Sequence, residues 1–229
     1  MLKTVLTHPL VRGRDLDDPA TTGLKRRLVR DKLFLRRIYE EWYAMIGAAL
    51  PPGDKPILEL GAGPGFFAES RDDTIASEVF PCKGIDVVLD GGRLPFAADS
   101  LRAIVMTDVF HHLPDVETFF REATACVAPG GRIVMIEPWT TAWSRLIYTR
   151  LHHEPFDPGA SAWTLPAGGP LSGANGALPW IVFGTASALT MVGVAVGLWV
   201  IAAALFEPLQ RIFSSSRSGT RLSRSQWGM

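Results

Sequence analysis

The spacing of apolar side chains changes along the chain, and each change marks an expected element. Between residues 24 and 50 apolar side chains recur every three or four positions, as at Leu35, Ile38 and Trp42, while charged side chains take the opposite face. This spacing predicts an amphipathic helix that covers a sheet, and a Pro-Pro-Gly run at 51–53 predicts its end. Because this segment is rich in Lys and Arg, a basic helix lying on a membrane surface is the alternative.

After residue 55 the pattern becomes a series of short apolar runs separated by turn residues. We expect strands at 56–60, 74–80, 85–90, 101–108 and 131–137, a short helix after the first strand, and a longer helix over about 115–127. Strands that alternate with helices predict βαβ units and a mostly parallel sheet covered on both faces. The expected fold class is therefore α/β, Rossmann-like and doubly wound.

Length and composition narrow the class of protein. A chain of 229 residues suffices for one such domain with an appendage. Lys+Arg and Asp+Glu both number 23, so the formal net charge is zero and nucleic acid is not an expected partner. Two cysteines are too few for a disulfide framework and lack the spacing of a metal site, which favours a reducing compartment. The first residues lack the apolar core of a signal peptide, so we expect no export.

The most informative segment follows the first expected strand and reads Glu59-Leu60-Gly61-Ala62-Gly63-Pro64-Gly65. Its glycines permit a tight turn with positive φ and let a ligand approach the backbone closely. The free N–H groups of a following helix would suit an anionic ligand group. Alone, such a loop suits a nucleotide, a dinucleotide or a methyl donor, and its glycines can also serve only the turn.

Three further features follow in order. Glu78 lies near the end of the second expected strand, where a carboxylate can accept hydrogen bonds from ribose hydroxyls. Asp90 ends the third strand, and the apolar sequence Leu94-Pro95-Phe96 after it is able to flank an adenine ring. A Pro-Gly-Gly turn at 129–131 leads into the fifth strand.

Together with His111-His112-Leu113-Pro114 after the fourth strand, these motifs resemble those of the class I S-adenosylmethionine-dependent methyltransferases, specifically the group acting mostly on small molecules. The resemblance covers roughly residues 55–140. It argues against a dinucleotide-binding oxidoreductase, which would have Gly-x-Gly-x-x-Gly. The resemblance implies S-adenosylmethionine as cofactor, with cofactor-binding residues Glu59, Gly61, Ala62, Gly63, Gly65, Glu78, Asp90 and Gly91.

By the same resemblance, Glu59 and the three glycines contact the methionine part of the cofactor, Glu78 binds its ribose, and Asp90 with Gly91 faces its adenine. The sequence departs from the family at one place, because only residues 81–84 separate the second and third strands where a helix is usual. Asp86 is therefore the alternative ribose ligand.

Methyl transfer is an in-line displacement, so the protein must mainly orient the reactants, exclude water, and provide a base where the acceptor loses a proton. Asp108, His111 and His112, at the end of the fourth strand, are the candidate catalytic residues. A histidine titrates near neutrality and can accept a proton, and a structural or cofactor-lining role is the alternative. We expect no metal, although His152-His153-Glu154 adds potential ligands, because adjacent histidines point in different directions.

The segment 138–163 is rich in aromatic residues and follows the fifth strand, where it would overlook the ligand crevice. We interpret it as an apolar lid over the acceptor, with core packing as the alternative. The expected acceptor is therefore a small lipophilic molecule, such as a quinone, a lipid or a polyketide-like compound.

The last third of the chain has a different composition. Residues 180–206 contain no charged side chain, and about 20 apolar residues suffice to cross a bilayer. We expect a C-terminal membrane-embedded helix there, with a buried hairpin that completes the sheet as the alternative. We expect the enzyme domain to face the cytoplasm, where the methyl donor is found. By the positive-inside rule, however, the basic residues after 206 would place the tail in the cytoplasm, and a single span would then put the enzyme domain on the other side.

The expected organisation is an irregular arm (1–22), a methyltransferase domain (23–154), a Pro/Gly-rich loop (155–179), an apolar membrane-associated segment (180–206) and a basic disordered tail (207–229). The alternative function is a catalytically silent S-adenosylmethionine-binding protein, or a membrane scaffold, with an atypical C-terminus.

Overall fold

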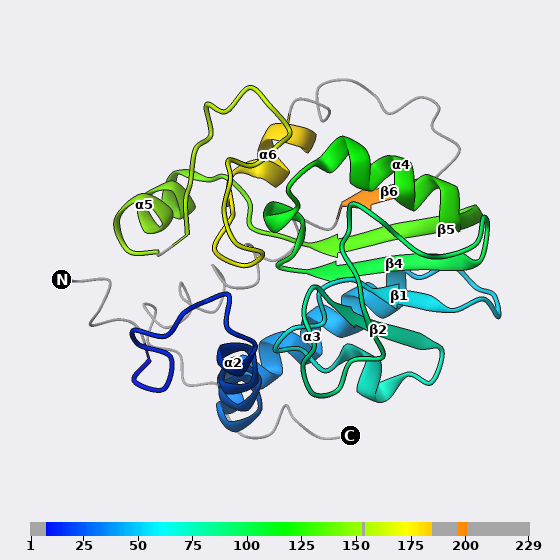
Figure 1. Ribbon diagram of the computed structural model, residues 1–229, viewed down its shortest axis with the longest axis horizontal. Helices are drawn as coiled ribbons and strands as arrows, with labels where there is room; N and C mark the ends of the chain where they lie inside the picture. The colour runs from blue at the N-terminus through cyan, green and yellow to red at the C-terminus, as the bar shows by residue number, and fades with distance from the viewer. Residues whose placement is uncertain (1–7, 153, 185–196, 201–229) are drawn as a thin grey trace, which may run out of the picture.

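A parallel β-sheet forms the centre of the protein (Figure 1). The computed structural model describes residues 8–152, 154–184 and 197–200. The sheet has six strands in the order β3-β2-β1-β4-β5-β6, and every neighbouring pair is parallel. The strands are β1 (Ile57–Glu59), β2 (Thr74–Glu78), β3 (Val87–Val88), β4 (Leu101–Thr107), β5 (Val127–Ile136) and β6 (Gly197–Val200). This order is that of a doubly wound, Rossmann-like sheet, so the expected α/β fold class is confirmed.

Helices cover both faces of the sheet. The helices are α2 (Pro19–Asp31), α3 (Leu33–Ala49), α4 (Val116–Cys126), α5 (Ala142–Arg150) and α6 (Leu178–Phe183), with two short 3₁₀ turns, η1 (Phe67–Ser70) and η2 (Phe110–His112). In β4, Ile104 and Met106 pack in the core that α4 and α6 cover, whereas Ala103 and Val105 pack beneath α3. Because successive side chains of a strand point to opposite faces, one continuous apolar run supplies both cores.

The helix expected over residues 24–50 is two helices. Lys32 has extended backbone angles (φ −91°, ψ 101°) and separates α2 from α3. The first helix begins earlier than expected, because the Asp18 side chain accepts a hydrogen bond from the Ala20 backbone N–H at 2.8 Å and Pro19 takes the first helical position. Residues 19–22, expected in an irregular arm, are therefore helical.

The connection between β2 and β3 contains no helix, as the short spacing in the sequence indicated. Parallel neighbours are usually joined by a dozen or more residues. Here β3 is only two residues long and pairs Ser77 with Val87 and Glu78 with Val88. The loop 79–86 therefore leaves the end of β2 close to the glycine loop.

The expectation of one helix through 180–206 is wrong at residues 197–200. These residues form β6, which pairs with β5 from Gly197↔Arg132 to Val200↔Met135 and extends the edge of the sheet. An apolar run without polar positions fits a buried strand as well as a helix, so its period could not decide. Residues 1–7, 153, 185–196 and 201–229, including the expected tail, lie outside the described residues. Among the described helices, none is long and apolar enough to cross a membrane.

Candidate functional site

A cavity of about 470 Å³ lies at the carboxyl ends of the central strands, in the size range of small-molecule sites. In open α/β sheets, ligands bind at this edge. The glycine loop after β1 and the segment 168–171 both line this cavity. The cavity is lined by eight of the expected site residues, namely Gly61, Gly63, Glu78, Asp90, Gly91, Asp108, His111 and His112.

The glycine loop has a backbone that few other residues could adopt. Gly61 and Gly63 have φ angles of +66° and +39°, in the left-handed region that favours glycine. A Cβ atom on Gly61 would lie only 2.6 Å from Cγ2 of Val109. The Gly63 backbone N–H donates a hydrogen bond to Oε2 of Glu78 at 3.0 Å, which ties the loop to the end of β2.

Three expected cofactor ligands, Glu59, Ala62 and Gly65, are not among the described residues that line the cavity. Glu59 is buried and accepts a hydrogen bond from the Ala68 backbone N–H at 3.2 Å. Burial raises the pKa of Glu59 to about 7, although the Ala68 hydrogen bond opposes the shift. Ala62 donates its N–H to the Ser77 carbonyl, and Gly65 donates to the Ala62 carbonyl. These residues shape the loop, and their contact with a cofactor stays a prediction.

The two acids considered for the ribose have different surroundings. Glu78 lines the cavity, and its Oε1 accepts a hydrogen bond from the Val79 N–H at 2.8 Å. Burial raises its pKa, while the hydrogen bonds from Val79 and Gly63 act in the opposite direction. Asp86 instead accepts a hydrogen bond from the Ala76 backbone N–H at 2.8 Å and supports β2. This arrangement favours Glu78 over Asp86 as the residue that faces a ligand.

Of the residues that we expected to lie near the adenine, only some line the cavity. Asp90 lines the cavity, and its Oδ1 accepts the Gly92 N–H at 2.8 Å. The apolar segment 94–96 does not contribute to the described lining, because Leu94 is buried in the core beside α4. Leu89 and Leu113 provide the apolar surface beside Asp90 instead.

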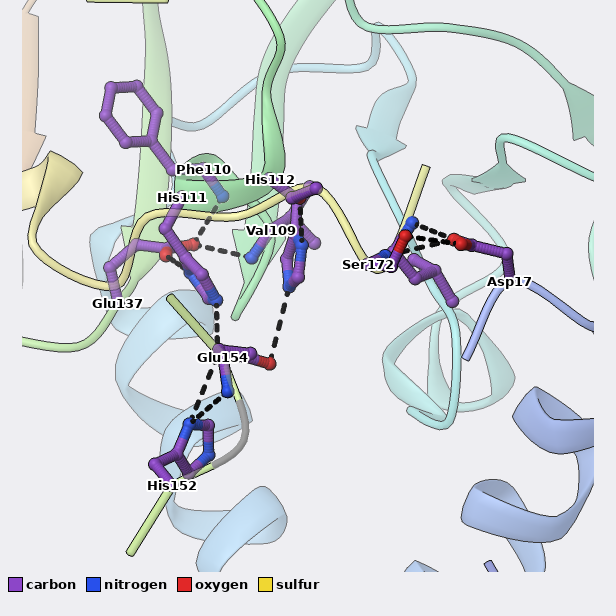
Figure 2. Close-up of polar contacts among 11 residues, drawn as sticks. Asp17, Val109, Phe110, His111, His112, Glu137, His152, Glu154 and Ser172 are labelled. Atoms are coloured by element: carbon purple, nitrogen blue, oxygen red, sulfur yellow. Dashed lines mark hydrogen bonds and ion pairs between the residues drawn. The ribbon is translucent and has the colours of Figure 1, made fainter. Parts of the chain in front are cut away.

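The turn after β4 carries the three candidate catalytic residues. Asp108 has a φ of +56°, which is unusual for a residue other than glycine, and such backbone strain concentrates at functional sites. Glu137, directly after β5, holds this turn: its Oε1 accepts the backbone N–H groups of Val109 at 2.7 Å and Phe110 at 2.8 Å. Its Oε2 lies 2.7 Å from Nδ1 of His111 (Figure 2).

Both histidines turn their second ring nitrogen toward one carboxylate (Figure 2). Nε2 of His111 lies 3.4 Å from Oε2 of Glu154, and Nε2 of His112 lies 3.7 Å from Oε1. Nδ1 of His112 is 2.9 Å from the Gly173 carbonyl oxygen. Nδ1 of His152 lies 3.6 Å from Oε2 of Glu154, while His153 lies outside the described residues. Adjacent histidines therefore share a partner here, contrary to the expectation.

His111, His112 and Glu154 form a cluster in which the pKa of each side chain is shifted. Burial alone would lower the pKa of His111, but the Glu137 and Glu154 carboxylates outweigh burial and raise it. Burial would raise the pKa of Glu154, but the hydrogen bond and charge of His111 lower it to about 2. Burial lowers the pKa of His112, and the neighbouring His111 adds to this shift. The result is a charged pair, His111 and Glu154, beside a neutral imidazole.

The model of a methyltransferase domain family matches residues 32–166, more than half of the chain. The chain belongs to this family of methyltransferases. An uncharacterised methyltransferase of Mycobacterium tuberculosis is 29% identical over 124 residues, which is 44% of this chain and 49% of that protein. The chain therefore spans about half the length of the curated relatives that it matches.

Solved structures are similar over part of the methyltransferase chain. An S-adenosylmethionine-dependent methyltransferase from Mesorhizobium loti is 24% identical, with 40% of this chain and 50% of that chain covered and a TM-score of 0.34. A corresponding enzyme from Aquifex aeolicus is 18% identical, with 49% and 68% covered and a TM-score of 0.38. S-adenosylmethionine is the cofactor that the family implies.

Fewer of the aromatic residues in 138–163 line the cavity than we expected of an apolar lid. Of those aromatic residues, Tyr148 on α5 lines the cavity and stacks on Phe156, with 5.2 Å between ring centroids. Trp143 and Trp163 are exposed. Figure 1 shows α5 beyond the arrowheads of β4 and β5. Pro170 and Leu171 complete this apolar wall.

The N-terminal arm fixes that wall from outside. Asp17 accepts hydrogen bonds from the backbone N–H groups of Leu171 at 2.7 Å and Ser172 at 3.0 Å (Figure 2). No pattern in the sequence predicts this contact, because the two segments lie more than 150 positions apart. Thr22, Lys25 and Tyr39, on α2 and α3, also line the cavity and were not expected.

Glu137 is a further site residue that was not expected from the sequence. Its position at the end of the fifth expected strand was a usable signal, because the carboxyl ends of parallel strands share one edge of the sheet.

Proposed function

We propose that the chain binds S-adenosylmethionine in the cavity and transfers its methyl group to a small lipophilic acceptor. The observation that carries this proposal is that one cavity is lined by the glycine loop, Glu78, Asp108 and both histidines. Family membership supports the choice of cofactor.

The residues at the cofactor end fit this molecule. Gly61 and Gly63 expose backbone to the cavity with no side chain between. We propose that Glu78 accepts hydrogen bonds from the ribose hydroxyls, and that the adenine lies near Asp90 and Gly91. When bound, the cofactor supplies an activated methyl carbon, and the role of these residues is to orient it and to exclude water.

The acceptor end combines apolar and polar groups. Tyr39, Tyr148 and Leu171 provide apolar surface, while Asp108 and His112 provide groups able to accept a proton. Such a mixture suits a mostly apolar acceptor that carries a few polar atoms. We therefore propose a lipophilic acceptor with an acidic hydroxyl, nitrogen or carbon at its reacting end.

Incorporation of a labelled methyl group tests the proposal. The full chain, incubated with methyl-labelled S-adenosylmethionine and a lipid extract, is expected to transfer label to an extractable product. Glu78→Gln should reduce the transfer at least tenfold, whereas the matched control Asp86→Asn should retain it. Binding of the cofactor without any label transfer would favour the catalytically silent alternative.

We also propose that the chain associates with membranes, with the methyltransferase domain in the cytoplasm. The support for this is the absence of charged residues in 180–206, although residues 197–200 of that run belong to the sheet. Truncation before 180 is a poor test, because it would remove α6 and β6 from the fold. The full chain is expected to sediment with membranes and to stay there in high salt, and recovery in the supernatant would contradict the proposal.

A further inference from the structure

We propose that His111, His112 and Glu154 bind one divalent transition-metal ion at the acceptor end of the cavity. Each residue offers one ligand atom, and these atoms all lie within 4.8 Å of one another. The three residues line the cavity that the proposed function uses. The role that we give the ion in binding the acceptor rests on that function, whereas the binding of the ion itself does not.

The separations suit a single ion. Zinc bonds imidazole nitrogen and carboxylate oxygen at about 2.0–2.1 Å, so two ligand atoms of a tetrahedral site lie about 3.4 Å apart. The two nitrogen–oxygen separations are 3.4 Å for His111 and 3.7 Å for His112. These two separations are close to that value, and all three ligand atoms lie within 4.8 Å of one another.

The outer partners of the histidines are those of a metal site. Metal-ligating histidines almost always donate the other ring N–H to a carboxylate or a backbone carbonyl, which fixes the tautomer and the orientation of the ring. Glu137 lies 2.7 Å from Nδ1 of His111, and the Gly173 carbonyl oxygen lies 2.9 Å from Nδ1 of His112. With Nδ1 protonated on both rings, the Nε2 atoms are the ones that face Glu154 (Figure 2). A bound ion would replace the Nε2 proton of the His111–Glu154 pair and take the lone pair that this proton leaves.

Two elements far apart in the sequence hold the ligands in place. His111 and His112 belong to η2, whose first residues are fixed by Glu137. Glu154 follows α5 and comes to the cavity from the opposite side. The ligands are therefore positioned by the fold before any ion arrives, which favours binding.

The ligand set also indicates the kind of ion and its use. Two imidazoles and one carboxylate suit zinc or iron(II), and three protein ligands leave a position open for a water molecule or a substrate. Because the site lines the cavity, that position is accessible to the acceptor. The ion would then select acceptors with a hydroxyl oxygen, whose proton a metal makes easier to lose.

Titration with cobalt(II) tests the binding directly, because its visible absorption reports a tetrahedral nitrogen and oxygen site. The full chain, stripped with a chelator, is expected to bind one ion per chain. His112→Gln and Glu154→Gln should each weaken binding at least tenfold, whereas the matched control His8→Gln, at a histidine outside the cluster, should bind as the unaltered chain does. Far-UV circular dichroism checks that each variant is folded.

The inference is overturned if the folded chain shows no saturable binding, or if the two cluster variants bind cobalt(II) as tightly as the control. A separate calorimetric titration with S-adenosylmethionine on the same preparation distinguishes the two proposals. Metal binding without cofactor binding would count against the proposed function only, and the reverse result would count against the metal site only.

Discussion

Nδ1 of His111 and Oε2 of Glu137 lie 2.7 Å apart, and the two side chains are 2% and 0% exposed. The other oxygen of Glu137 accepts two backbone N–H groups of the turn after β4. One carboxylate at the end of β5 thus positions the turn that carries the candidate catalytic residues.

Replacement of this carboxylate should be costly. Glu137→Ala leaves two buried backbone N–H groups and the His111 ring without their acceptor, and breaking such a buried pair costs about 3–5 kcal/mol. We expect urea denaturation to show a fall of that size in the free energy of unfolding. Glu41→Ala, at an exposed position of α3, is the control and should change it by less than about 0.5 kcal/mol. A loss below about 1 kcal/mol for Glu137→Ala would contradict the account.

Gly61 should not tolerate a methyl group. Gly61→Ala places a Cβ atom 2.6 Å from Cγ2 of Val109 at a φ of +66°, so the loop must move. We expect lower thermal stability and at least tenfold weaker binding of S-adenosylmethionine by calorimetry. Gly47→Ala is the matched control, because Gly47 lies within α3 with nothing within 4 Å of its added Cβ. That change should stabilise the chain by roughly 0.5–1 kcal/mol, and similar losses in both variants would argue against a specific role for Gly61.

The two acids beyond the glycine loop should differ in cofactor binding. Glu78→Gln removes the negative charge that faces the cavity, and we expect it to weaken binding of S-adenosylmethionine about tenfold or more, since hydrogen bonds to a charged group contribute about 1.5–3 kcal/mol. Asp86→Asn should bind the cofactor normally, because Asp86 supports the backbone of β2. Isothermal titration calorimetry measures both. The opposite ranking would assign the ribose to Asp86.

Glu59 should make stability depend on pH. Its pKa is about 7 in the fold, against an ordinary value of 4.5, so the folded chain keeps a proton that the unfolded chain releases. The free energy of unfolding therefore decreases as pH rises from about 4.5 to 7, by up to about 3 kcal/mol, and levels off above that range. Glu59→Gln removes the titration and should become progressively more stable than the unaltered chain between pH 5 and 8. Urea denaturation at several pH values measures this difference, and a difference that does not change with pH would refute the assignment.

Much of the fold could be predicted because the strands bury both faces. The apolar run that contains Ile104 and Met106 could only be a buried element, and the turn residues around it set its length. The break at Lys32 was hidden, because apolar spacing continues across it from α2 to α3. A strand at β6 was expected only as part of the alternative hairpin, since an apolar run without polar positions has no period that distinguishes strand from helix.

The site residues likewise fall into those that could be placed from the sequence and those that could not. Gly61, Glu78 and His111 could be placed in one crevice because each lies at or shortly after the carboxyl end of a strand, and the carboxyl ends of parallel strands share an edge. Glu154 and Asp17 could not be placed, because their contacts depend on how long segments outside the sheet fold back over it. No local sequence pattern predicts how these segments fold back over the sheet.

Direct titration with S-adenosylmethionine tests whether the cavity binds the methyl donor. Isothermal calorimetry on the folded full chain should show saturable binding of one cofactor molecule per chain, abolished or strongly weakened by Gly61→Ala and unaffected by Gly47→Ala. A folded chain that releases no heat of binding, and whose melting temperature does not change with the cofactor present, would contradict the assignment of this cavity to the methyl donor.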